Sequence, residues 1–243
     1  CMPTVGLPKH AIKAVELGDD VVTVKGGEGG GHTGAVPTTL LIPQIVDAVG
    51  DRVPVVAAGG FKDGRGLLAA LSWGADGIAM GTRFLMTEDS PVPRETLQRY
   101  IDCKNPAEII VSRAMDGLPQ RMIMNELLHE LEQAGPARKL WIALSNGLRF
   151  RKHTGASVTD LLKSAWQMHK DDDITTAQAI MSANAPMIIQ KAMVEGQPAN
   201  GVLPSGQVAG VIDELLTCED LINAIVTEAE QRLSLLAVRA NAT

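Results

Sequence analysis

The feature that most constrains the fold is a regular alternation of short apolar runs with amphipathic stretches over residues 1–88. Strands are expected at residues 2–5, 21–24, 53–58 and 77–80. Helices are expected between them, at residues 9–17, 38–49 and 63–73. Strands and helices that alternate at this spacing form parallel βαβ units. The sequence therefore predicts an α/β fold with a buried parallel sheet.

The sequence changes character at about residue 89, where Pro91 and Pro93 interrupt the pattern. Helices are expected at residues 93–101, 105–114, 120–133, 137–150, 157–168, 174–194 and 218–238. Two domains follow from this change. Residues 1–88 form the βα region, and residues 89–243 form a helical extension that packs on it.

Charge and cysteine content exclude several classes of protein. The formal net charge is −6 and no basic block is present, so the sequence argues against nucleic-acid binding. No apolar run reaches the roughly 18 residues that a membrane span needs. The three cysteines are widely spaced and form no CxxC pair, which argues against a zinc site. A reduced, cytoplasmic setting is the expected one.

A glycine-rich loop follows the second expected strand. Residues 26–34 read Gly-Gly-Glu-Gly-Gly-Gly-His-Thr-Gly. Glycines let a backbone turn tightly and approach a ligand closely, and the peptide N–H groups of such a loop can line an anion. His32 lies in this loop after a parallel strand, where catalytic residues lie in (β/α) barrels. The alternative is a flexible surface turn with no chemical role.

Two further small-residue turns follow the third and fourth expected strands. The first contains Gly59 and Gly60, and the second contains Gly81 and Thr82. Exposed N–H groups in such turns, together with the Thr82 hydroxyl, can hold a phosphate between neighbouring loops. The alternative is close packing of helix on sheet, which also requires glycine.

Together these motifs resemble the nitronate monooxygenase (2-nitropropane dioxygenase) family. The resemblance rests on residues 26–34, on Ala-Ala-Gly-Gly-Phe-Lys-Asp-Gly-Arg-Gly at 57–66 and on Ala-Met-Gly-Thr-Arg-Phe at 79–84. The weaker matches at residues 116–125 and 203–210 extend it over nearly the whole chain. The family includes flavin-dependent enoyl-acyl-carrier-protein reductases, and the sequence is most similar to actinobacterial flavin reductases that act on CoA thioesters.

The resemblance implies an FMN-binding (β/α)8 barrel of the TIM type and assigns roles to several residues. Gly59, Gly60, Gly81 and Thr82 would hold the FMN phosphate. Gly26 and Gly27 would lie against the flavin, and His32 would face the substrate near the flavin N5. Gln207 would help to close the cofactor pocket. No metal site is expected.

Lys25 departs from the family pattern, which usually has Gln, Asp or Glu at this position. A lysine beside the flavin N1–C2 edge would stabilise the anionic reduced flavin. The alternative is that Lys25 points to solvent or pairs with Glu28. Gly29 also departs from the nitronate oxidisers, which commonly have Ala or Cys, and so favours the thioester reductases.

Four βα units are only half of an eight-stranded barrel. The sequence begins in what reads as a strand, so we expect this chain to hold roughly the last four βα units of a longer protein. The missing N-terminal half of the barrel would be in the same chain or another chain. A homo-oligomer is also possible, since the helical extension offers apolar faces.

The expected function is an NAD(P)H-dependent, FMN-containing reductase of an unsaturated acyl-CoA or related thioester. One alternative is a monooxygenase that oxidises alkyl nitronates with O2. An alternative of another class is a non-catalytic assembly subunit with degenerate flavin loops. His32 would exchange a proton with the substrate in either enzyme.

Overall fold

The computed structural model describes residues 1–135 and 176–241, which fall into two compact units. The first unit contains residues 1–91, 100–109 and 205–243, and the second contains residues 92–99 and 110–204. The helices expected at 137–150 and 157–168 lie outside the described residues. Each unit consists of segments that are far apart in the sequence. Residues 205–243 belong with the βα region rather than with the helices that precede them.

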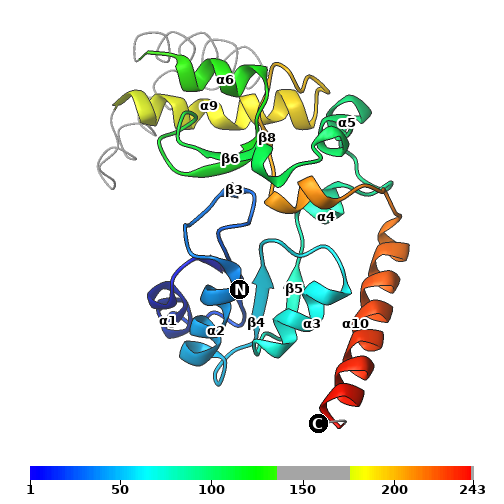
Figure 1. Cartoon of the computed structure of the whole chain (residues 1–243). Coiled ribbons are helices and arrows are strands. Elements are labelled where there is room, and N and C mark those ends of the chain that lie inside the picture. Colours follow the sequence, from blue (N-terminus) through cyan, green and yellow to red (C-terminus); the bar gives the residue numbers. More distant parts are fainter. Residues whose placement is uncertain (136–175, 242–243) are drawn as a thin grey trace. The chain divides into compact units, whose positions relative to one another are not determined.

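A four-stranded parallel sheet forms the centre of the first unit (Figure 1). Its strands run in the order β1-β2-β4-β5, which are Thr4–Val5, Val22–Lys25, Val55–Ala58 and Gly77–Ala79. The register pairs Thr23 with Thr4 and Val56, and all three strand pairs are parallel. The expected α/β fold with a parallel sheet is confirmed.

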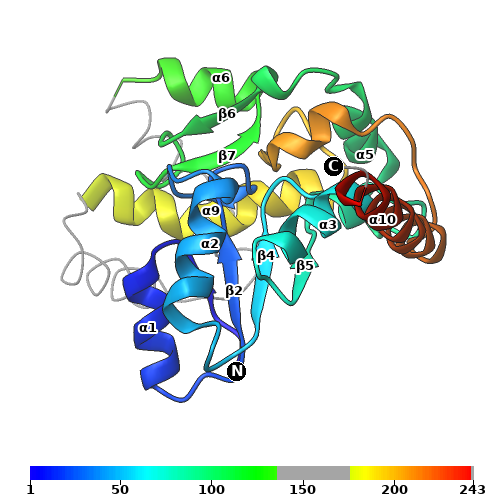
Figure 2. The same ribbon diagram turned by 60° about the horizontal axis from the view of Figure 1, so that its bottom comes forward.

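Helices α1 (Pro8–Glu16), α2 (Thr38–Val49) and α3 (Gly64–Ser72) connect these strands as expected. Figure 2 shows α1 and α2 side by side along the sheet. A single apolar cluster joins Val22, Val24, Val55 and Ala57 of the strands to Leu41, Ile42 and Ile45 of α2 and Ala70 of α3. Because side chains alternate along a strand, Thr23 and Lys25 point to the opposite face.

The long helix α10 (Cys218–Ala240) packs along α3 in the first unit (Figure 1). Thr217 caps its N-terminus, because the Thr217 hydroxyl accepts a hydrogen bond from the Asp220 N–H. Leu221, Ile225 and Ala229 are buried against the unit. The helix expected at 218–238 is confirmed.

Short elements complete the first unit. They are the two-residue strand β3 (Gly31–His32), the one-turn helix α4 (Thr82–Leu85) and the 3-10 helices η1 (Pro106–Glu108) and η2 (Gln207–Val211). Helix α5 (Arg94–Asp102), whose residues up to Arg99 are counted in the second unit, confirms the helix expected at 93–101. β3, α4 and η2 all lie within or beside the motifs singled out in the sequence.

The second unit contains strands where the sequence predicted helices. Strands β6 (Ile109–Ser112) and β7 (Gln120–Ile123) replace the helix expected at 105–114 and the first part of the one at 120–133. The helix expected at 105–114 was wrong, because the β-branched run at Ile109–Val111 favours an extended backbone. The helix expected at 120–133 was wrong only in its first part, which forms β7. β8 (Leu203–Pro204) pairs antiparallel with β7.

Helix α6 (Glu126–Gln133) confirms the second part of the helix expected at 120–133, and helix α9 (Thr176–Met193) confirms the one expected at 174–194. Asn125 fixes the start of α6, since its side-chain oxygen accepts from the Leu128 N–H at 2.9 Å. Its amide nitrogen donates to the Gly201 carbonyl at 2.6 Å. One buried side chain thus ties α6 to the loop before β8. In the described part of the chain, no helix is long and apolar enough to cross a membrane.

Candidate functional site

The face of the sheet opposite the helices carries small side chains at the carboxyl ends of its strands. Lys25 is in register with Ala58, and Ala58 is in register with Ala79. In a parallel sheet, residues in register point to the same face. Two alanines beside a lysine leave room above the strand ends for a flat group.

The buried hydroxyl of Thr23 lies on the same face, two residues before Lys25. It has no hydrogen-bond partner among the described residues. Buried polar atoms normally have one. This face is therefore suited to a ligand or water that brings a polar group.

The glycine-rich loop after β2 is closely packed rather than a flexible turn. The Gly26 N–H donates to the Ala58 carbonyl at 3.1 Å, and the Gly27 N–H donates to the Val36 carbonyl at 2.7 Å. A Cβ at Gly26 would lie 2.6 Å from the Thr38 backbone. Gly26 and Gly27 are buried. The absence of side chains at this loop lets it pass against the N-terminus of α2.

Glu28 and Lys25 hold this loop from opposite sides. The Glu28 carboxylate accepts hydrogen bonds from the Thr38 N–H at 3.0 Å and from the Thr38 hydroxyl. The Lys25 ammonium donates to the Gly30 carbonyl at 3.3 Å and to the His32 carbonyl. Lys25 is half-buried, and this burial lowers its pKa. The two side chains therefore do not pair with each other; each anchors a different part of the loop.

Four segments meet at this edge of the sheet through direct hydrogen bonds. The Thr38 hydroxyl shares its one proton between the Glu28 carboxylate and the Gly59 carbonyl oxygen, which lies 3.1 Å away. The Gly206 N–H donates to the Thr82 hydroxyl at 2.9 Å. The Gln207 N–H donates to the Glu28 carbonyl at 3.0 Å. The structure thus joins the glycine-rich loop, the two small-residue turns and the segment at 206–207 into one site.

The two turns leave hydrogen-bond donors available. Within the described residues, the peptide N–H groups of Gly60, Gly81 and Thr82 donate to no protein atom. No described heavy atom outside its chain neighbours lies within 4 Å of a Cβ built on Gly81. Free N–H groups beside open space are what an anionic ligand requires. The residues present therefore fit a phosphate at this edge.

The start of α3, in contrast, is already satisfied by the protein. Asp63 accepts from the Gly66 N–H at 3.2 Å, and Glu228 of α10 accepts from the Gly64 N–H at 3.0 Å. These two carboxylates already balance the partial positive charge at the start of α3, so a bound anion would gain little there. The candidate phosphate position is accordingly confined to the turns.

His32 lies at the end of the glycine-rich loop, in β3, and its side chain is exposed. The backbone of the residue is fixed through its carbonyl by Lys25. The imidazole is thus carried by the same loop that meets Gly59 and Gln207. Its role as a proton donor or acceptor remains a prediction.

Sequence reasoning missed two residues that organise the site, Glu28 and Thr38. Their signal was present: a lone carboxylate inside a glycine-rich loop, and a threonine at the first position of the next helix. A carboxylate accepts readily from the free N–H groups at a helix start. Among the described residues, no group of three or more His, Cys, Asp or Glu side chains could hold a metal ion.

Comparison with known families agrees with this arrangement. The model of the family described as nitronate monooxygenase matches residues 1–228. The chain belongs to the nitronate monooxygenase family.

Two similar family members carry the same name, (3aS,4S,5R,7aS)-5-hydroxy-7a-methyl-1-oxo-octahydro-1H-indene-4-carboxyl-CoA dehydrogenase. The protein from Rhodococcus jostii is 48% identical over 98% of this chain, and the one from Mycobacterium tuberculosis is 45% identical over 94% of it. The chain spans 67% and 64% of their respective lengths. It therefore corresponds to about two thirds of each relative.

Among solved structures, FabK from Thermotoga maritima matches with a TM-score of 0.70 and 26% sequence identity. The match covers 98% of this chain and 63% of the FabK chain. Nitronate monooxygenase family membership and this likeness confirm the expected fold class, an α/β fold of the (β/α)8-barrel type. That this chain holds only part of a barrel stays a prediction.

Proposed function

We propose that this chain carries the flavin-binding part of an FMN-dependent oxidoreductase that acts on a CoA thioester. The observation that carries the proposal is the meeting of four sequence-distant segments at one sheet edge. There the N–H groups of Gly60, Gly81 and Thr82 donate to no atom of the described residues. Membership of the nitronate monooxygenase family supports a flavin. The names of the two similar relatives support a CoA thioester substrate.

In this proposal the FMN phosphate binds the turns at Gly59–Gly60 and Gly81–Thr82. The small face formed by Ala58 and Ala79 then accommodates the isoalloxazine ring. Lys25 and the backbone of Gly26 and Gly27 border the ring, and Gln207 closes the pocket beside the loop. When bound, FMN supplies the atom that exchanges hydride with the substrate carbon.

The proposed task of His32 is proton transfer. Each ring nitrogen of an imidazole can donate or accept a proton, which suits the side chain to acid–base chemistry. The proton would move to or from the substrate atom beside the carbon that exchanges hydride. Lys25 keeps the loop, and with it His32, in position.

NAD(P)H as the second substrate is the finer part of the proposal, because a flavin exchanges hydride with nicotinamides. The proposal also includes further βα units that complete the barrel, from the same or another chain. It places the protein in a reduced, cytoplasmic setting. Oxidation of a nitronate is the second candidate, and the description of the matching family favours it.

The decisive experiment starts from protein loaded with FMN. Anaerobic addition of a bicyclic carboxyl-CoA thioester, or of NAD(P)H with an unsaturated acyl-CoA, is expected to change the visible absorbance of the flavin. Oxygen uptake with an alkyl nitronate tests the second candidate. Protein that does not bind FMN would support the assembly subunit and overturn the proposal.

His32→Ala is expected to slow turnover by about a hundredfold while FMN stays bound. His10→Ala is the matched control, since His10 is an exposed imidazole on α1. Equal turnover in the two variants would remove His32 from the mechanism.

A further inference from the structure

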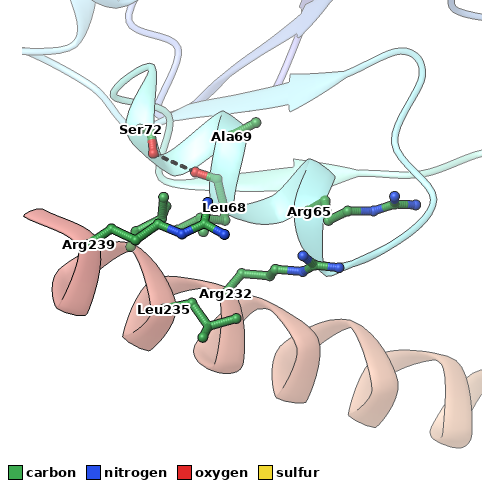
Figure 3. A pocket seen from close by; sticks show the side chains of 8 residues that line it. Arg65, Leu68, Ala69, Ser72, Arg232, Leu235 and Arg239 are labelled. Carbon is green, nitrogen blue, oxygen red and sulfur yellow. Dashed lines mark hydrogen bonds between the residues drawn. The ribbon is translucent and has the colours of Figure 1, made fainter.

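A groove between α3 and α10 gathers three arginines over an apolar floor (Figure 3). It encloses about 270 Å³. Arg65, Arg232 and Arg239 line it together with Leu68, Leu235 and Leu236. All six residues belong to the first unit. In a chain of net charge −6, a groove lined by three guanidinium groups is an unusual concentration of positive charge.

The carboxylates of the groove only partly neutralise these arginines. Arg65 pairs with Asp63 and lies 3.7 Å from Glu228. Arg232 shares the same Glu228 oxygen at 3.7 Å. Glu228 is also committed to the Gly64 N–H.

Arg239 has no acidic partner within the part of the chain that the structure describes. Figure 3 shows its side chain lying along the groove. The groove thus has an excess of positive charge at the Arg239 end.

Size and lining define the kind of ligand. Pockets that hold whole small molecules measure about 300–1,000 Å³, so this groove suits one end of a larger ligand. A guanidinium group binds phosphate with two parallel hydrogen bonds and stacks on flat rings. The leucines offer the apolar contact that such a ring needs. A phosphorylated nucleoside has both parts.

We infer that this groove binds the phosphorylated adenosine end of a CoA thioester. The inference rests on the proposed function and extends it to a second site, outside the flavin turns. Arg65 lies in the first turn of α3, five residues after Gly60, so one end of the groove follows the turn at Gly59–Gly60 closely in sequence. The acyl end could then reach over the sheet edge while the adenosine end stays between the two helices. Binding energy from such a remote part of a substrate can serve the reaction.

Direct binding tests the groove without any need for activity. The probes are CoA, 3′-dephospho-CoA and NADPH, measured by isothermal titration calorimetry on the purified chain. Arg239→Ala is expected to weaken CoA binding by about tenfold or more, because it removes a charged partner of a phosphate. The control is Arg52→Ala, which removes an exposed arginine on the same unit but away from the groove.

Two results of the titration would overturn the inference. One is CoA affinity that is equal in Arg239→Ala and Arg52→Ala. The other is a loss confined to NADPH, which would assign the groove to the nicotinamide cofactor. Circular dichroism of both variants checks that α10 is unchanged; Arg239 is exposed in its last turn, so little change is expected.

Kinetics separate this inference from the proposed function. With FMN-loaded protein, Arg239→Ala should raise KM for the CoA thioester and leave kcat unchanged. The same variant should not alter KM for the matching pantetheine thioester, which lacks the adenosine end. If the FMN-loaded protein turns over the thioester but Arg239→Ala binds CoA as well as the original protein, the groove inference fails and the proposed function stands. If Arg239→Ala weakens CoA binding but the FMN-loaded protein shows no turnover, the groove inference stands and the proposed function fails.

Discussion

Gly59, after β4, and Gly81, after β5, end neighbouring strands in similar ways, yet their surroundings differ. Gly59 has a φ of +102°, and a Cβ there would lie 3.2 Å from the Gly26 carbonyl oxygen. Gly81 has a φ of −87°, which any residue adopts, and open space where a Cβ would be. Glycine at 59 is thus required by the protein itself. At Gly81 no described residue imposes such a need, and in the proposed function the glycine leaves room for a ligand.

The difference teaches how to read a glycine motif. The alternative interpretation of close packing holds for Gly26 and Gly59, and it fails for Gly81. The same sequence pattern therefore covers glycines that packing requires and a glycine that packing does not require. Substitutions at the two positions should separate stability from binding.

The largest effect is expected from Gly59→Ala. Its positive φ strains an alanine by about 1–3 kcal/mol, and contact with the Gly26 backbone adds to this. Urea denaturation followed by circular dichroism measures the loss of unfolding free energy. Gly18→Ala is the control, because Gly18 has a φ of +93° with no atom within 4 Å of its Cβ position. A loss at Gly59 no greater than at Gly18 would contradict the role of packing.

Gly81→Ala is expected to leave the unfolding free energy within about 0.5 kcal/mol of the original value. It should weaken FMN binding by about tenfold, because the methyl group occupies the ligand's space. Fluorescence titration with FMN measures the affinity. Unchanged FMN affinity would show that FMN does not occupy the open space at Gly81. The proposed difference between Gly59 and Gly81 would then be wrong.

The smallest effect concerns Lys25, which anchors the loop between the two turns. Burial lowers its pKa below the ordinary 10.5, so the folded state releases the proton before the unfolded state does. The unfolded state then binds more protons between the two pKa values, and stability rises with pH up to about 10.5. Stability of the original protein relative to Lys25→Met should therefore increase from neutral pH towards that value. Denaturant midpoints at a series of pH values test this, and a flat or falling difference would contradict it.

Local patterns in the sequence were enough to predict most of the first unit. Each apolar run that became a strand is followed by glycine or by a small-residue turn, and the helix at Thr38–Val49 has the bounds expected. The strands β6 and β7 were missed because short apolar runs fit a helix and a strand equally well. The pairing of β7 with β8 crosses about 80 residues of chain, which periodicity cannot reveal.

The candidate site was predictable in its parts but not in its connections. Glycine and threonine at 59–60 and 81–82 are visible as motifs, and so is His32. The Thr82–Gly206 hydrogen bond joins residues 124 positions apart, and the Gln207–Glu28 bond joins still more distant ones. The place of Arg239 in a groove could not be predicted for the same reason, since only the packing of α10 on α3 forms this groove.

The position of Gly206 and Gln207 also has a consequence for biosynthesis. A ribosome synthesises the chain from its N-terminus, so the sheet and the turns at Gly59–Gly60 and Gly81–Thr82 emerge long before their partner at η2. Contacts between distant segments form late, because a long loop must first be closed. Nascent chains would thus keep an incomplete site until residue 207 has left the ribosomal exit tunnel, and binding of the proposed FMN would follow synthesis rather than accompany it.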